Sequence, residues 1–118
     1  MLDHTLVYFV ATSNLPAGNT VPSLWEKVDG QAPLELLQGV ESMAIKYGVN
    51  GTGYQRAIAV ANWDVINSVQ IEFLVQGLDT NSLDSAQSYT FDGVLTTPND
   101  RRIRQVFTST FAVRTRLQ

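Results

Sequence analysis

The stretch NSVQIEFLVQ, residues 67–76, decides the fold, because polar and apolar side chains alternate along it, with Leu74 as the one apolar residue on the otherwise polar side. One side of an extended chain over this stretch carries Val69, Ile71, Phe73 and Val75. A period of two is typical of a strand with one face against a core and the other face largely in water. We therefore predict a strand over residues 67–76 in an antiparallel sheet with one covered face.

A second alternating stretch, residues 101–114, predicts a long final strand. Ile103, Phe107 and Phe111 fall on one face, and threonines and arginines fill the other face. Since that second face is polar, we expect it to be wet, with the strand pairing in an antiparallel sheet.

The first half of the chain also favours strands. Residues 6–10 and 21–28 are rich in branched and aromatic side chains, and turn-forming residues 13–19 separate them. Asp29-Gly30 is a strong turn signal after the second of these runs. We predict a hairpin with a long loop over the first 30 residues, then a short strand to about Leu37, a kink at Gly39 and a strand over 40–47.

The remaining segments complete the expected fold. We predict loops over 48–53 and 77–88, a turn over 97–100, and a strand over 89–96. Residues 54–63 contain three alanines and no helix breaker, which favours one short helix. The prediction is an α+β fold, mostly antiparallel β, in a single domain over residues 1–118, with most aromatic side chains filling its core.

The charge is distributed unevenly along the 118 residues. Residues 1–100 hold three bases and eleven acids, whereas residues 101–118 hold five arginines and no acid, for a net charge of −3. The arginines either lie solvated on a final strand or form a docking edge for an acidic partner. The acidic whole argues against nucleic acid. The candidate docking residues are Arg101, Arg102, Arg104, Arg114 and Arg116, together with Trp25 beside a turn.

The residue inventory does not favour an enzyme or a cofactor. His4 is the single histidine and cysteine is absent, so a zinc site or a Ser-His-Asp triad is not expected. Nothing fixes the carboxylate pairs Glu35/Glu41 or Asp79/Asp84 across a cleft. Residues 79–84 space oxygen ligands as calcium loops do, but they lack the central glycine and closing glutamate of an EF-hand. A plain polar loop and a calcium loop both remain open there.

Three segments in order carry a family resemblance. LELLQGVE (34–41) runs into IKYGV (45–49), WDVINSVQI (63–71) follows, and RRIRQVFTST (101–110) leads to VRTRL (113–117). This order resembles the distal half of PilW-type minor pilins of type IV pilus systems. Relatives often have an Asp-rich loop after Tyr-Gly, where this chain has NGTG (50–53).

The resemblance implies a structural role. It predicts a pilin-like globular head with one short helix that contacts other minor pilins or pilin subunits during pilus assembly. The expected location is the periplasmic face of the inner membrane, or the pilus on the cell surface, of a Gram-negative bacterium. The resemblance further implies that membrane attachment comes only through a leader-preceded N-terminal apolar helix, which we expect to be missing from these 118 residues. The alternatives are a type II secretion pseudopilin and a secreted β-rich binding module.

Overall fold

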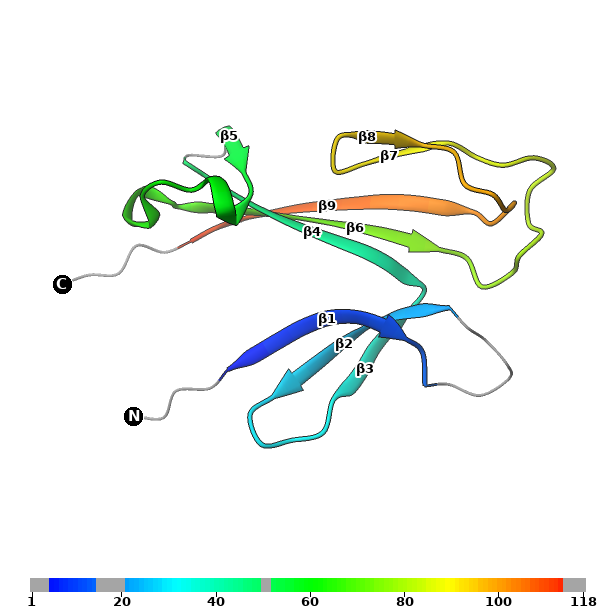
Figure 1. Ribbon diagram of the computed structural model, residues 1–118, viewed down its shortest axis with the longest axis horizontal. Helices are drawn as coiled ribbons and strands as arrows, with labels where there is room; N and C mark the ends of the chain where they lie inside the picture. The colour runs from blue at the N-terminus through cyan, green and yellow to red at the C-terminus, as the bar shows by residue number, and fades with distance from the viewer. Residues whose placement is uncertain (1–4, 15–20, 50–51, 114–118) are drawn as a thin grey trace.

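A computed structural model describes residues 5–14, 21–49 and 52–113. It contains three antiparallel sheets, and strands account for 56% of the described residues (Figure 1). The strands are β1 (Leu6–Thr12), β2 (Pro22–Val28), β3 (Leu34–Gln38), β4 (Val40–Val49), β5 (Thr52–Gln55), β6 (Ser68–Gln76), β7 (Tyr89–Phe91), β8 (Val94–Thr96) and β9 (Arg104–Ala112).

The central sheet has the strand order β5-β4-β6-β9, with β6 in its middle. Its register aligns Met43 with Phe73 and Phe73 with Phe107, so one face collects the apolar side chains of three strands. We call this the apolar face: Met43, Ile45, Val69, Ile71, Phe73, Val75, Phe107 and Phe111. The strand predicted over 67–76 and its apolar side are confirmed.

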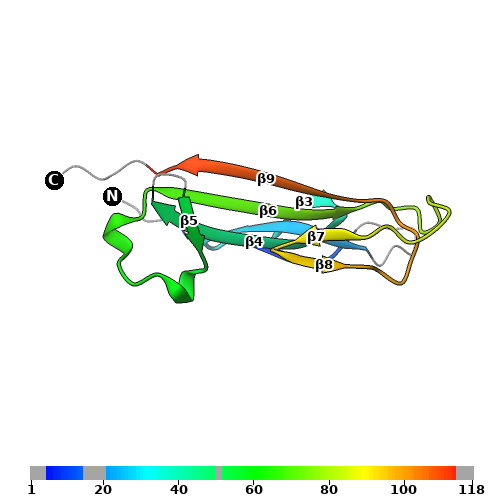
Figure 2. The same ribbon diagram turned by 90° about the horizontal axis from the view of Figure 1, so that it is seen from above.

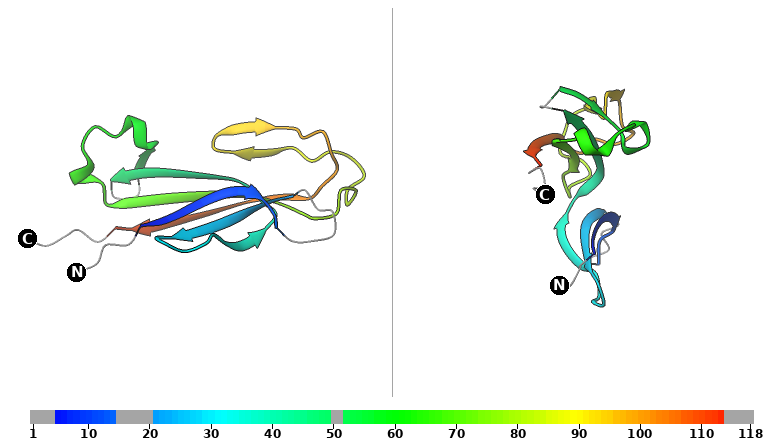
Figure 3. Two further views of the ribbon diagram at one scale, coloured as in Figure 1. Left: turned by 60° about the horizontal axis from the view of Figure 1, so that its bottom comes forward. Right: turned by 90° about the vertical axis from the view of Figure 1, so that its left-hand side faces the viewer.

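A side sheet, β1-β2-β3, lies along the apolar face (Figures 1 and 3). Its hairpin of β1 and β2 is the one that the first 30 residues predict. Phe9 and Trp25, paired across that hairpin, stack with ring centroids 6.2 Å apart. Cross-strand aromatic pairs of this kind stabilise a hairpin by a few tenths of a kcal/mol up to ~1 kcal/mol.

Gly39 joins the side sheet to the central sheet. It ends β3 and precedes β4 with a φ of +98°, so the predicted kink is confirmed. Its N–H donates to Pro22 O at 2.8 Å, and its carbonyl accepts from Gln76 N at 2.8 Å. Gly39 is therefore hydrogen-bonded to a strand of each sheet, and these two bonds fix how the sheets meet.

A hairpin of β7 and β8 covers the opposite face of the central sheet (Figure 1). Its turn is Asp92-Gly93, with φ values of +54° and +77°, as a two-residue type I′ turn requires. The Asp92 carboxylate pairs with Lys46 at 3.0 Å and with Arg56, and the Asp92 N–H donates to Glu72 at 2.9 Å. These contacts hold the hairpin tip over β4 and β6.

Three predictions are corrected on this side of the central sheet. Residues 89–96 form two short strands and a turn, because Asp92 and Gly93 adopt the left-handed backbone that reverses the chain. The polar side of β6 was expected to be wet, yet Leu74 and Gln76 on that side are buried. The same side of the final strand was expected to be wet, yet Arg104 is buried there.

The predicted short helix over 54–63 is wrong, and so is the α+β class that depended on it. The segment holds the end of β5 and the 3-10 turn η1 (Ala57–Ala59), and η2 (Trp63–Val65) follows. Ile58 in this segment is 95% exposed and Trp63 is 51% exposed, so no well-packed apolar face compensates the cost of nucleating a helix. The fold is nearly all antiparallel β, and the described residues form no α-helix.

Two boundaries also differ from the predictions. The loop expected over 48–53 contains the end of β4 and the start of β5, which pair as a hairpin. The final strand begins at Arg104, because Arg101 to Ile103 form an irregular connection held by side-chain contacts.

Few apolar side chains of the described residues are fully buried. Among the described residues, the buried apolar side chains are Val21, Val40 and Leu74. The molecule measures 55 × 36 × 19 Å, so few side chains lie far from its surface. Much of the apolar face therefore remains partly exposed.

Gly39→Ala should lower the free energy of unfolding by roughly 2–4 kcal/mol, because its backbone is left-handed and crowded. A Cβ at this position would lie 2.7 Å from the Gln76 carbonyl oxygen. Gly30→Ala is the matched control, because its φ is +71° but a Cβ added there would have no atom within 4 Å apart from its chain neighbours. The loss of unfolding free energy should therefore be about 1 kcal/mol. Urea denaturation of both variants checks this, and equal losses would contradict the role given to Gly39.

Candidate functional site

An open cleft lined by apolar side chains lies between the two larger sheets. One part has a volume of about 510 Å³ and is lined by Leu24, Leu37, Phe73, Val75 and Phe107. An adjoining part of about 290 Å³ shares Leu24 and Phe73 and adds Tyr8, Met43, Ile45 and Ile71. We call these two parts together the apolar cleft.

The strands explain why the cleft is apolar. Alternation along β4, β6 and β9 directs every second side chain to the apolar face, and Leu24 of β2 and Leu37 of β3 face it from the side sheet. The side sheet does not close over this surface: Leu37 is 52% exposed and Phe107 is 49% exposed. Neighbouring apolar side chains that remain partly exposed make this cleft the candidate site, because monomeric proteins rarely expose large contiguous apolar patches.

Arg104, a predicted docking residue, is instead bound inside the fold. Its guanidinium donates to both carboxylate oxygens of Asp100, at 2.7 and 3.0 Å, and to Glu41 at 2.9 Å. The side chain is 5% exposed and its guanidinium lies 5.8 Å from the centre of the Tyr89 ring. Arg104 thus connects β9, β4, β7 and the turn before β9, and its charge is not available to a partner.

The Arg104 guanidinium also sets the charge state of its partner. Its hydrogen bonds lower the pKa of Asp100 from 3.8 to about 2, against the opposing effect of desolvation. The same bonds raise the pKa of Arg104, so both groups stay ionised at neutral pH.

The structure separates the other predicted docking residues. Arg102 donates to the carbonyls of Gly77 and Leu78 at 2.8 and 3.1 Å, so it ties the loop after β6 to the chain before β9. Arg101 is exposed and donates to Asn81 at 3.0 Å. Arg114 and Arg116 lie outside the described residues, as does His4. The described arginines therefore mainly hold the fold together.

Trp25, the other predicted docking residue, lies within the side sheet. It is partly buried against Phe9, and its indole N–H donates to the Ala11 carbonyl at 3.3 Å. Its position is that of a packing residue rather than a free contact residue.

The two glutamates weighed for catalysis are engaged in contacts within the fold. Glu35 accepts hydrogen bonds from Ser23, from Ser13 at 2.7 Å and from the Asn14 N–H at 3.1 Å, and the serine bonds lower its pKa. Glu41 pairs with Arg104. The two glutamates therefore belong to different contacts.

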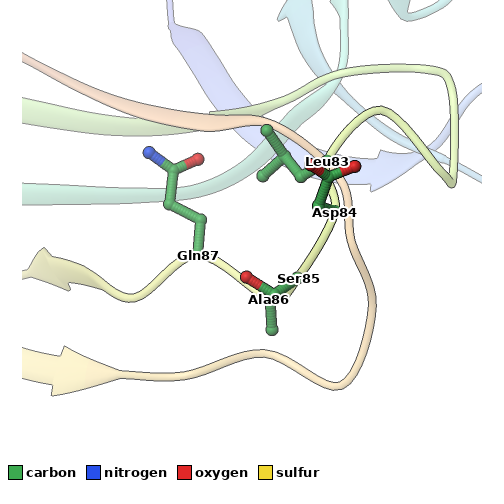
Figure 4. A pocket seen from close by; sticks show the side chains of 5 residues that line it. All are labelled: Leu83, Asp84, Ser85, Ala86 and Gln87. Atoms are coloured by element: carbon green, nitrogen blue, oxygen red, sulfur yellow. The ribbon is translucent and has the colours of Figure 1, made fainter.

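The loop over 79–84 is organised by its own backbone. Asp79 accepts from the Asn81 N–H at 2.9 Å, which is an Asx turn. Figure 4 shows the shallow depression beside it, lined by Leu83, Asp84, Ser85, Ala86 and Gln87. Among the described residues, no three His, Cys, Asp or Glu side chains gather as metal ligands would.

Sequence reasoning placed the residues of the apolar cleft in a closed core. Alternation predicts the apolar sides of the three strands, but it does not show that the side sheet covers them only in part. No helix of the described residues has the length and apolar character needed to cross a membrane.

Three antiparallel sheets with an open apolar cleft between two of them define a β-sheet domain with a partly covered apolar face. The sequence model of one family, described as Type IV Pilus-assembly protein W, matches residues 7–115. The chain belongs to this family, which associates it with type IV pilus assembly and with the cell envelope or pilus. No curated protein and no solved structure shows significant similarity to the chain.

Arg104→Ala should lower the free energy of unfolding by roughly 3 kcal/mol, because it leaves two carboxylates without their shared cation. Arg101→Ala removes an exposed arginine three residues earlier and should cost at most about 0.5 kcal/mol. Chemical denaturation of both variants checks this. Equal stability of the two variants would place Arg104 among ordinary surface charges.

Asp100 should make stability depend on acid pH. Its pKa is lowered in the fold, so the stabilisation is present above the ordinary value of 3.8 and is lost as the pH falls through about 2. Asp100→Asn should weaken the fold at neutral pH and flatten the decline between these values. Denaturation across this pH range tests it, with Asp84→Asn in the exposed loop as control. An unchanged slope in Asp100→Asn would refute the assignment.

Proposed function

We propose that this domain is the head of a minor pilin, a structural subunit that contributes to the assembly of type IV pili by contacting other pilin subunits. Membership of the assembly protein W family supports the pilus context. The observation that carries the contact role is the apolar cleft, whose partly exposed lining is formed by apolar and aromatic side chains.

Leaving the apolar lining of the cleft in contact with water is unfavourable. Each Å² of apolar area removed from water contributes about 25 cal/mol, so covering several exposed side chains stabilises a complex by several kcal/mol. Leu37 and Phe107 are each about half exposed, and they stand on opposite sides of the cleft. A pilin subunit with an apolar segment inserted between them would cover both.

The proposed role also implies a location in the cell envelope. A subunit that primes pilus assembly would act at the periplasmic face of the inner membrane or in the pilus of a Gram-negative bacterium. The role is structural rather than catalytic, and the engagement of Glu35, Glu41 and Asp100 in contacts within the fold supports this.

The binding test uses the soluble domains of the other minor pilins of the same system. Leu37→Glu should weaken the complex at least about tenfold, because it places a charge among apolar contacts at the cleft. Val65→Glu is the matched control, because Val65 is 51% exposed against 52% for Leu37 but does not line the cleft.

Isothermal titration calorimetry measures both affinities, and thermal melting verifies that both variants fold. The proposal fails if the unmodified domain forms no complex at high concentration. It also fails if the two variants bind equally well, because the contact would then lie elsewhere.

A further inference from the structure

Strand β9 forms one margin of the central sheet. It pairs with β6 on one side, and no strand of the described chain pairs with its other side. Figure 2 shows β9 along this margin with no element beyond it. An open edge presents a row of backbone donors and acceptors to other chains.

The backbone hydrogen bonds identify which residues face outward. Gly77 N donates to the Ile103 carbonyl at 2.8 Å, and Val113 N donates to the Asn67 carbonyl at 2.9 Å. The backbone N–H and C=O groups of the odd-numbered residues of β9 therefore point toward β6. Because the direction of the backbone groups alternates along a strand, the N–H and C=O groups of the even-numbered residues point away from β6, toward the open edge. Apart from Arg104, whose N–H donates to the Gln87 side chain at 3.5 Å, these are Val106, Thr108, Thr110 and Ala112.

Beyond Arg104, the part of the edge over residues 105–112 carries no charge, proline or bulge that would block edge-to-edge pairing. Its register with β6 is uninterrupted over nine residues, so no bulge bends the strand away. The sequence between Arg104 and Arg114 holds no proline, no glycine and no charged residue. Natural edge strands typically use lysine, proline or a bulge to prevent association, and β9 uses none of these.

The side chains of β9 are arranged almost symmetrically about Ser109. On either side of it stand Thr108 and Thr110, then Phe107 and Phe111, then Val106 and Ala112. An antiparallel pair of identical strands crossing at Ser109 places each residue opposite its near-equivalent. Near-symmetry of this kind suits a two-fold axis, because both strands then present the same surface.

We propose that β9 is a homotypic docking edge, on which a second copy of this chain adds its own β9 antiparallel about Ser109. The outward-facing residues then meet one another, Thr108 opposite Thr110 of the second copy and Val106 opposite Ala112. Each of these is a hydrogen-bonded pair, so the two central sheets join into one continuous sheet.

The aromatic residues supply the apolar contribution. In this register Phe107 lies opposite Phe111 of the second copy at a non-hydrogen-bonded position, where side chains approach most closely. The two side chains are 49% and 52% exposed in the single chain, and pairing covers them. The inference stands on the edge strand alone and does not depend on the role in pilus assembly.

Charge at positions 108 and 110 tests the pairing and its register together. The double variant Thr108→Lys/Thr110→Lys sets like charges opposite each other at two symmetry-related places and should raise the dimer dissociation constant about tenfold or more. The matched variant Thr108→Glu/Thr110→Lys sets opposite charges there and should dimerise at least as well as the unmodified chain. Sedimentation equilibrium over rising concentration measures the constant, and thermal melting verifies folding.

Hydrogen exchange gives a second reading that needs no variant. The amides of Val106, Thr108, Thr110 and Ala112 should become protected as the concentration rises, whereas those of Phe107, Ser109 and Phe111, already bonded to β6, should not change. A chain that stays monomeric at millimolar concentration would overturn the proposal. So would a dimer in which both charge variants associate equally, or one without new protection at the four even positions.

Discussion

The register of β6 with its two neighbours is the constraint on which the rest of the structure depends. It aligns Met43, Phe73 and Phe107 on one face, and it brings Glu41 of β4 within reach of Arg104 on β9. A shift of one residue would send every side chain of a strand to the other face. The apolar cleft, the buried arginine and the outward-facing groups of β9 all follow from that one alignment.

Much of this fold could be predicted from alternation alone, since a period of two is a strong signal in the strands around Phe73 and Phe107. The misses lie where tertiary contacts decide. Helix propensity at residues 54–63 had no packed face to support it, and Ile58 remains in water. The Asp92-Gly93 turn was overlooked although its dipeptide is a known hairpin signal, because Tyr89 to Thr96 also suits one strand.

The candidate site was less accessible to sequence reasoning. The five C-terminal arginines form one block in the sequence, but Arg104 and Arg102 turn toward carboxylate and carbonyl groups of the fold. Only the three-dimensional register brings Glu41 to Arg104, 63 residues away in the chain. The apolar cleft was missed for a related reason: alternation shows that a face is apolar, whereas the area available to cover it depends on the whole topology.

We propose above all that the partly exposed apolar face of the central sheet is a contact surface between protein subunits. The most direct measurement is an NMR titration of the isotope-labelled domain with a soluble partner pilin domain. The account predicts that signals of Leu24, Leu37, Phe73 and Val75 shift together as the partner is added. Shifts confined to the loop over residues 77–88, with these four side chains unchanged, would contradict it.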